Sequence, residues 1–179
     1  MHRPLRGRVH RLKTFRIVGA LAALTLGVGL TMVAPQAALA ATPPPHPTCS
    51  GYGCDGKDPA TYCPDGTTVS SRFINDESGQ AVGTIELRYS RNCRTTWGRI
   101  GIYRTLYEAG AVTFAIGQVI RNVYPYPSQR CRSLAWSDVT RMYTCYTTML
   151  NDANLTSFAN GQVGLTYNAS TAYAETSLY

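Results

Sequence analysis

The stretch Gly83-Thr84-Ile85-Glu86-Leu87-Arg88-Tyr89-Ser90 decides the fold class of this chain. Its apolar residues Ile85 and Leu87 alternate with the charged residues Glu86 and Arg88, and this period of two predicts a strand with one buried face. After residue 48, no segment sustains the apolar period of 3.6 that a capped helix of three turns requires. Strands are therefore expected to dominate the domain.

The same alternation continues along the chain. Within 112–121 it predicts that Phe114 and Ile116 are buried and that Ala115 lies on the other face. Turn-forming pairs such as Asn160-Gly161 separate the segments. Short helical turns are expected at 106–109 and 151–158. The predicted strands are 83–90, 95–106, 112–121, 141–150 and 162–169, and they indicate an all-β fold, a small antiparallel barrel or sandwich.

Six cysteines follow residue 48, and an even number in an exported chain predicts three disulfides. Residues 49–66 also hold four glycines and two prolines, so a loop-rich, disulfide-stapled N-terminal region is expected. Cys131 and Cys145 flank a predicted hairpin around Ser137-Asp138, which makes them the best-supported pair. For the other four, the favoured pairs are Cys49 with Cys54 and Cys63 with Cys93, and other pairings stay open.

The N-terminus has the pattern of an export signal. Residues 1–16 carry six cations and no acid, an apolar run follows at 17–33, and Ala38-Leu39-Ala40 offers the small residues that signal peptidase reads. We expect a signal peptide at 1–40, a Pro-rich linker at 41–48 and a single disulfide-bonded β domain at 49–179. The competing interpretation, a retained anchor, is disfavoured because the run is short and interrupted by glycine. The predicted location is secreted, either extracellular or associated with the cell envelope, with no membrane span after processing.

Composition narrows the chemistry of the exported domain. All three histidines precede residue 48, so the domain lacks imidazole for catalysis or metal binding. Without residues 1–40 the chain has eleven Lys and Arg against ten Asp and Glu. This near-neutral balance gives no support for nucleic-acid binding, and a partner recognised by charge alone is not expected.

Two stretches carry a family resemblance: Cys49-Ser50-Gly51-Tyr52-Gly53-Cys54-Asp55-Gly56-Lys57-Asp58-Pro59 and Cys93-Arg94-Thr95-Thr96-Trp97-Gly98-Arg99-Ile100. Together with Cys63 and residues 86–90, they resemble the exported, mainly actinobacterial family known as domain of unknown function 2690. Gly98 departs from the pattern, because alanine is usual there, and so does Pro64-Asp65-Gly66, which replaces a more helical stretch. The resemblance implies export and a compact disulfide-bearing domain, and it implies no activity.

The Tyr124-Pro125-Tyr126-Pro127 turn is the predicted binding surface. Proline fixes the backbone, so two rings on this turn lose little entropy when they stack on a sugar or a peptide. Arg121 and Arg130 flank the turn with donors suited to carboxylates or sugar hydroxyls. The expected partner is an unidentified extracellular polymer or protein, and ordinary loop packing is the competing interpretation.

Asp55, Asp58 and Asp65 form the densest carboxylate cluster, whose hard oxygen ligands would suit Ca²⁺. The same side chains would equally accept backbone hydrogen bonds in tight turns, and this interpretation is favoured, so no cofactor is expected. A zinc site at Cys49 and Cys54 competes with the disulfides, but no histidine completes it.

These observations favour a non-enzymatic binding or structural module that acts at the cell envelope or on an extracellular partner. One alternative is a secreted enzyme with paired carboxylates, for which Glu86, Glu108, Asp138 and Asp152 are further candidates. Another is a protease inhibitor or antagonist that presents loop 122–128.

Two residues near the fourth cysteine have expected structural roles. Arg88 is predicted to pair with Asp58 or Asp65, because it alternates with the buried residues of its strand. Trp97 is predicted to pack in the core.

Overall fold

The computed structural model describes residues 49–179, and the predicted signal peptide and Pro-rich linker lie outside the described residues. Two antiparallel sheets make up this part of the chain. The first contains β1 (Thr67–Asn75), β2 (Ala81–Ser90), β3 (Thr95–Tyr103), β6 (Ala135–Ser137), β7 (Met142–Tyr146) and β8 (Leu150–Asn151). The second contains β4 (Val112–Arg121), β5 (Ser128–Cys131), β9 (Ser157–Leu165) and β10 (Thr171–Glu175).

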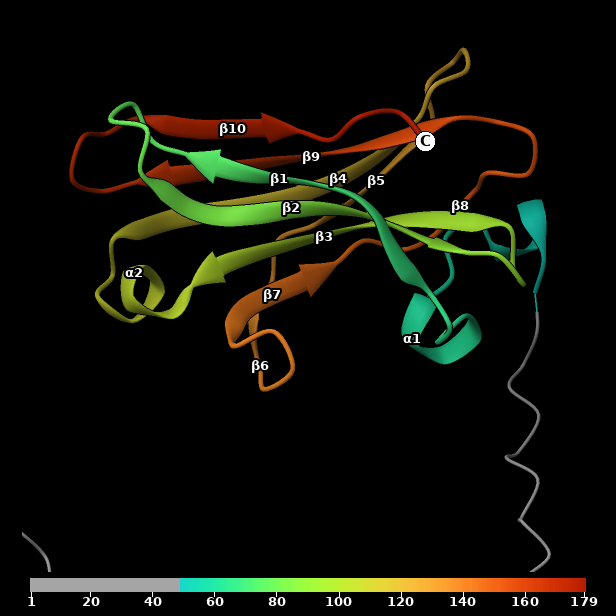
Figure 1. Ribbon diagram of the computed structural model, residues 1–179, viewed down its shortest axis with the longest axis horizontal. Coiled ribbons are helices and arrows are strands. Elements are labelled where there is room, and N and C mark those ends of the chain that lie inside the picture. Colours follow the sequence, from blue (N-terminus) through green and yellow to red (C-terminus); the bar gives the residue numbers. More distant parts are fainter. Residues whose placement is uncertain (1–48) are drawn as a thin grey trace, which may run out of the picture. The chain divides into compact units, whose positions relative to one another are not determined.

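The sheets pack face to face (Figure 1) as a sandwich, so the all-β prediction is confirmed. The first sheet has the order β1-β2-β3-β7-β6, with β8 also paired to β3, and the second has the order β10-β9-β4-β5. The short helices are η1 (Gly51–Cys54), α1 (Pro59–Tyr62) and α2 (Arg104–Glu108), the last at the predicted helical turn. In the described residues, no helix has the length and apolar character that a membrane crossing requires.

Branched aliphatic side chains of the first sheet meet small residues of the second. Ile74, Ile85 and Ile100 are fully buried. A methyl group on Gly161 of β9 would come within 2.7 Å of the Ile74 side chain and 3.1 Å of Ile85. Because protein interiors are close-packed, a larger residue at Gly161 would push the sheets apart. Gly161 therefore sets the spacing of the sheets in the main core.

The inner face of β4 is opposite to the predicted one. Ala115 and Val119 are buried, whereas Phe114 is 43% exposed. Small side chains are required inside because β4 lies close to β3, where a methyl group on Gly117 would be 3.0 Å from Ile100. The period of two was correct, but its phase was wrong because side-chain volume decides which face of this strand is buried.

Two other segments differ from the prediction. The strand predicted at 141–150 is interrupted between β7 and β8, where the Gly98 amide donates to the Thr147 hydroxyl at 3.0 Å in place of a backbone carbonyl. The helical turn predicted at 151–158 is wrong, since β9 already begins at Ser157. The strand predicted at 162–169 therefore starts earlier and ends at Leu165.

All six cysteines form disulfides, and the pairs are those that the spacing favoured. The Cys49–Cys54 bond lies within the N-terminal region, and the Cys63–Cys93 bond ties that region to the turn between β2 and β3. The Cys131–Cys145 bond joins β5 to β7 and so links the two sheets covalently.

Trp97 packs with the two N-terminal disulfides and Met149 in a second, smaller core. The side chain of Trp97 is 3% exposed, as predicted for a core residue. A methyl group on Gly66 would lie 1.9 Å from the Trp97 ring, so only glycine fits there. The ring thereby joins the N-terminal region to β3.

Replacing Trp97 by alanine is expected to lower the free energy of unfolding by about 3 to 5 kcal/mol, because a large buried ring leaves a cavity. Equilibrium denaturation in guanidinium chloride measures this change. Trp136→Ala is the matched control, since that ring is only half-buried and should cost less. An unchanged denaturation midpoint for Trp97→Ala would contradict the role of this ring.

Candidate functional site

The outer face of the first sheet carries a row of charged residues. Alternate residues of β2 enter the core, so Glu86 and Arg88 point outward. The strand register places Glu86 opposite Arg99 and Arg88 opposite Trp97 on β3. Regular antiparallel pairing thus gathers these four side chains on one surface.

Glu86 is shared between two arginines. Arg99 Nη2 donates to Glu86 Oε2 at 2.5 Å, and Arg88 Nη1 lies 3.8 Å from the same oxygen. The Thr68 hydroxyl also donates to Oε2 at 2.6 Å. One carboxylate therefore serves two guanidinium groups, and this cluster keeps one positive charge.

The prediction that Arg88 pairs with Asp58 or Asp65 is wrong. Arg88 instead donates to the backbone carbonyl of Gly66, next to Trp97. Asp58 accepts from a backbone amide in the first turn of α1, and Asp65 accepts from the Ser90 hydroxyl at 2.7 Å. Asp58 is thus used as the cap of α1 and Asp65 as a contact to the end of β2, so Glu86 is the carboxylate left to face the arginines.

The two arginines differ in how far the surroundings compensate their charges. Burial and the nearby charge of Arg99 lower the pKa of Arg88, and Glu86 offsets only part of that effect. Burial also opposes the charge of Arg99, but Glu86 and Tyr146 outweigh it and raise the pKa of Arg99. Arg88 is therefore the less compensated cation of the pair.

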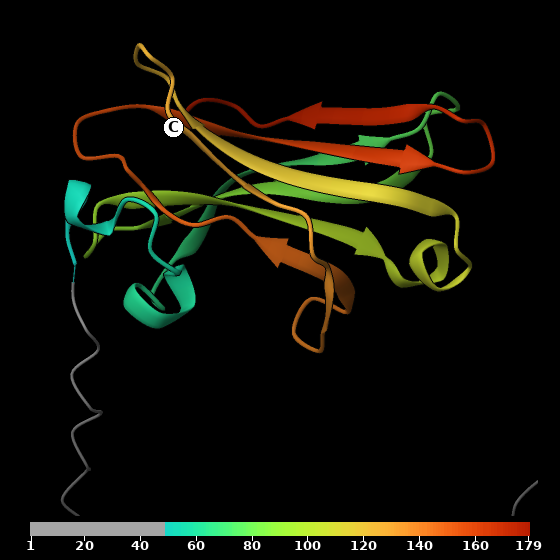
Figure 2. The ribbon, with the colours of Figure 1, turned by 180° about the vertical axis from the view of Figure 1, so that it is seen from behind.

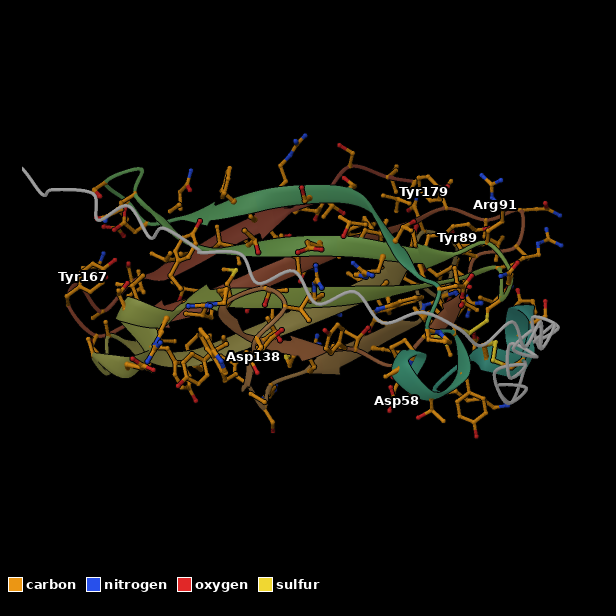
Figure 3. The ribbon with its side chains drawn as sticks, turned by 60° about the horizontal axis from the view of Figure 1, so that its bottom comes forward. Asp58, Tyr89, Arg91, Asp138, Tyr167 and Tyr179 are labelled. Carbon is orange, nitrogen blue, oxygen red and sulfur yellow. A yellow bond between two sulfur atoms is a disulfide. The ribbon has the colours of Figure 1, made fainter. Side chains whose placement is uncertain are left out.

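A hollow of about 280 Å³ opens beside these charges. The guanidinium of Arg99 lies 6.0 Å from the centroid of the Tyr146 ring at its wall. Figure 3 turns this face of the first sheet toward the reader, with Asp58 labelled beside the start of α1. The lining consists of Arg88, Trp97, Arg99 and Tyr146 on the sheet and of Pro59, Ala60, Cys63 and Pro64 around α1.

Two of the predicted binding residues, Tyr124 and Tyr126, lie on the surface, 84% and 57% exposed. Their loop is a closed turn in which the Tyr126 amide donates to the Val123 carbonyl at 2.7 Å. The loop between β4 and β5 projects from the side of the sandwich opposite to α1 and β7 (Figures 1 and 2). It is therefore separate from the hollow.

Arg121, another predicted binding residue, is buried. Its side chain is 5% exposed, and Nη2 donates to Asp55 Oδ2 at 3.1 Å. The guanidinium also lies 4.9 Å from the centroid of the Tyr52 ring. Arg121 thus holds η1 against the end of β4, and its guanidinium is already engaged within the protein.

The three aspartates considered for Ca²⁺ are not brought together. Asp55 holds Arg121 and the Asn151 amide, Asp58 caps α1, and Asp65 accepts from Ser90 at the end of β2. Within residues 49–179, one group of metal-type ligands is close enough to share an ion, and it consists of four sulfurs already joined in disulfides. These are the sulfurs of Cys49, Cys54, Cys63 and Cys93.

Asp152 is a buried carboxylate near Arg121. Burial raises its pKa to about 6, against the opposing effects of the Ser157 hydroxyl, which donates at 2.6 Å, and of the Arg121 charge. Between the ordinary pKa of 3.8 and about 6, the folded state holds a proton that the unfolded state has released. Stability therefore falls as the pH rises through this window.

Replacing Asp152 by asparagine should remove this pH-dependent loss while preserving an acceptor for Ser157. Relative to the wild type, the variant is expected to gain stability as the pH rises from 4 to 7. Chemical denaturation at several pH values measures the difference, with Asp138→Asn as the exposed control. A stability difference that stays constant over this range would contradict the assignment.

Sequence reasoning missed Arg99 and Tyr146 as members of a site. The alternation of residues in the sequence predicted that Glu86 and Arg88 share one face of a strand, and this was the signal in the sequence that pointed to the site. The pairing of β3 with β2 and β7, which brings Arg99 opposite both Glu86 and Tyr146, required the register.

The fold and the site define an all-β, disulfide-bonded domain with a cationic, aromatic-lined hollow. Residues 52–160 match the family described as "Protein of unknown function (DUF2690)", and the chain belongs to this family. It is also similar to the uncharacterized protein YjfA of Bacillus subtilis (strain 168), with 33% identity over 121 residues, which is 62% of this chain and 71% of that protein. No solved structure matches the chain. The family match includes every residue that lines the hollow.

Proposed function

We propose that this protein is an exported binding domain that holds an anionic group of an extracellular ligand beside Arg88 and Arg99. One observation carries the proposal: Arg88 and Arg99, which line the hollow, share a single carboxylate, Glu86, beside it. A ligand carboxylate or phosphate would complete the charge balance with paired hydrogen bonds. Tyr146, 45% exposed, offers apolar surface to the rest of the ligand.

Export is supported by the N-terminal sequence pattern and by the three disulfides. Disulfides persist in oxidising compartments, so they are consistent with an extracellular protein. The proposed location is outside the cell or at its envelope.

The two alternative functions find less support in the geometry. The lining of the hollow beside Arg88 and Arg99 contains no carboxylate, and the neighbouring Glu86 is already engaged by Arg99. A glycosidase would require two carboxylates facing one cleft. Loop 122–128 is a closed turn, whereas the inhibitor hypothesis requires an extended exposed segment. Binding is the function that this arrangement favours.

Galacturonate, a sugar ring with one carboxylate, is the simplest probe of the hollow. We expect it to bind the wild type and to bind Arg88→Gln at least about tenfold more weakly, a loss of about 1.4 kcal/mol, because the less compensated cation is removed. Isothermal titration calorimetry measures the affinity.

Arg91→Gln is the matched control, since it removes the same charge from the exposed β2–β3 turn (Figure 3). Arg88 also donates to Gly66, so Arg88→Lys tests whether charge alone is enough, and an intermediate affinity is expected. Equal binding by the wild type and Arg88→Gln, or an equal loss in Arg91→Gln, would refute the site.

The Tyr124 and Tyr126 loop is proposed as a second contact surface for a macromolecular partner. Replacing both tyrosines by alanine should leave melting and galacturonate binding unchanged, because the rings are exposed and lie away from the hollow. Recovery of the partner from envelope fractions should fall at least about tenfold. Unchanged recovery would remove the loop from the partner surface, and a double variant that unfolds would place the rings among the structural contacts.

A further inference from the structure

We propose that the hollow beside Arg88 and Arg99 is one end of a longer cationic track, and that its ligand is an acidic glycan, a chain of sugar rings with carboxylate groups. This inference rests on the function proposed above and extends it from one anionic group to a polymer.

A second hollow, of about 660 Å³, adjoins the first. Tyr146 lines both, so its ring, 45% exposed, stands between them. The second hollow is formed by the segment that begins in β5 and by β6 and β7, and its basic residues are Arg130 and Arg132. The two hollows together contain four arginines and no carboxylate in their linings.

The four arginines gather on this surface although the described part of the chain is nearly neutral as a whole. Residues 49–179 contain almost equal numbers of basic and acidic side chains, eleven and ten. Arg130 and Arg132 are exposed, and neither forms an ion pair with another described residue. Their charges therefore remain available to a ligand, and a ligand that spans both hollows meets cations at each end.

The side chains between the charges suit sugar rings. Tyr146 presents an exposed ring face midway along the track, and aromatic faces pack well on the apolar side of a sugar. Ser133, Ser137 and Thr144 add hydroxyl groups to the second hollow, where ring hydroxyls need both donors and acceptors. Guanidinium groups bind carboxylates in a bidentate manner. An acidic glycan supplies carboxylates, hydroxyls and ring faces in one repeating unit.

A polymer gains affinity on such a track because, once one unit is bound, the next binds at a high effective concentration. Oligogalacturonates of increasing length, which carry one carboxylate on each ring, test this directly by titration calorimetry. For the wild type, the affinity is expected to rise at least about tenfold from the monomer to the octamer. Added salt should weaken the octamer more than the monomer, because more ion pairs form.

Replacing Arg130 and Arg132 together by glutamine should abolish the gain with length and leave monomer binding unchanged. Both residues are exposed, so the variant is expected to fold. Arg91→Gln with Arg94→Gln is the control, because it removes two exposed charges from the β2–β3 turn outside both hollows. Retention of the gain in the control and its loss in the Arg130 and Arg132 variant would support the track.

Other outcomes would overturn the inference in distinguishable ways. Monomer binding that does not strengthen with length would refute the track but leave the proposed anion site intact. No binding of monomer or octamer would refute both proposals. Equal binding of neutral chitin oligomers would refute recognition of charge, and tighter binding of single-stranded DNA would replace the glycan by a nucleic acid.

Discussion

The packing of branched side chains on glycine holds the two sheets at a spacing on which the rest of the domain depends. At Gly161 and Gly117 there is no room for a side chain, because Ile74, Ile85 and Ile100 already fill the space. These large core residues come from β1, β2 and β3, and alternation in β2 and β3 turns Glu86, Arg88 and Arg99 outward. The charged surface is thus a geometric consequence of how the core is filled.

The N-terminal region adds one wall to that surface. Its two disulfides pack on Trp97 from β3, and Gly66 gives the ring the room it needs. This small core holds α1 against the outer face of the first sheet, where Pro59 and Pro64 line the hollow opposite the arginines. A loop-rich segment without disulfides would have no comparable means of staying on the sheet, because it has few apolar residues of its own.

The strands were predictable where hydrophobic residues coincide with the buried face, as in β2. They were not predictable in β4, where Ala115 is buried and Phe114 is exposed, because the closeness of the partner sheet decides the volume that fits. Gly98 shows the same constraint: a methyl group there would lie 3.2 Å from the Gln118 carbonyl oxygen, so β3 and β4 tolerate only a small residue at this contact.

The site was harder to predict than the fold, because net charge conceals the distribution of charge. A near-neutral composition argued against a partner recognised by charge, yet Arg88 and Arg99 share a single carboxylate once the register is known. Asp58 and Asp65 were candidates for that role from sequence proximity. Asp58 instead caps α1 and Asp65 accepts from Ser90 at the end of β2, and both bonds depend on the backbone path of these elements.

The Cys131–Cys145 bond gives the surface a dependence on oxidation. Cys145 precedes Tyr146, the ring shared by both hollows, and Cys131 lies between Arg130 and Arg132. A covalent bond between β5 and β7 therefore fixes the distance from the ring to two of the four arginines. Disulfides persist in oxidising surroundings, so reduction of this bond would release the constraint that holds the ring and these two arginines together.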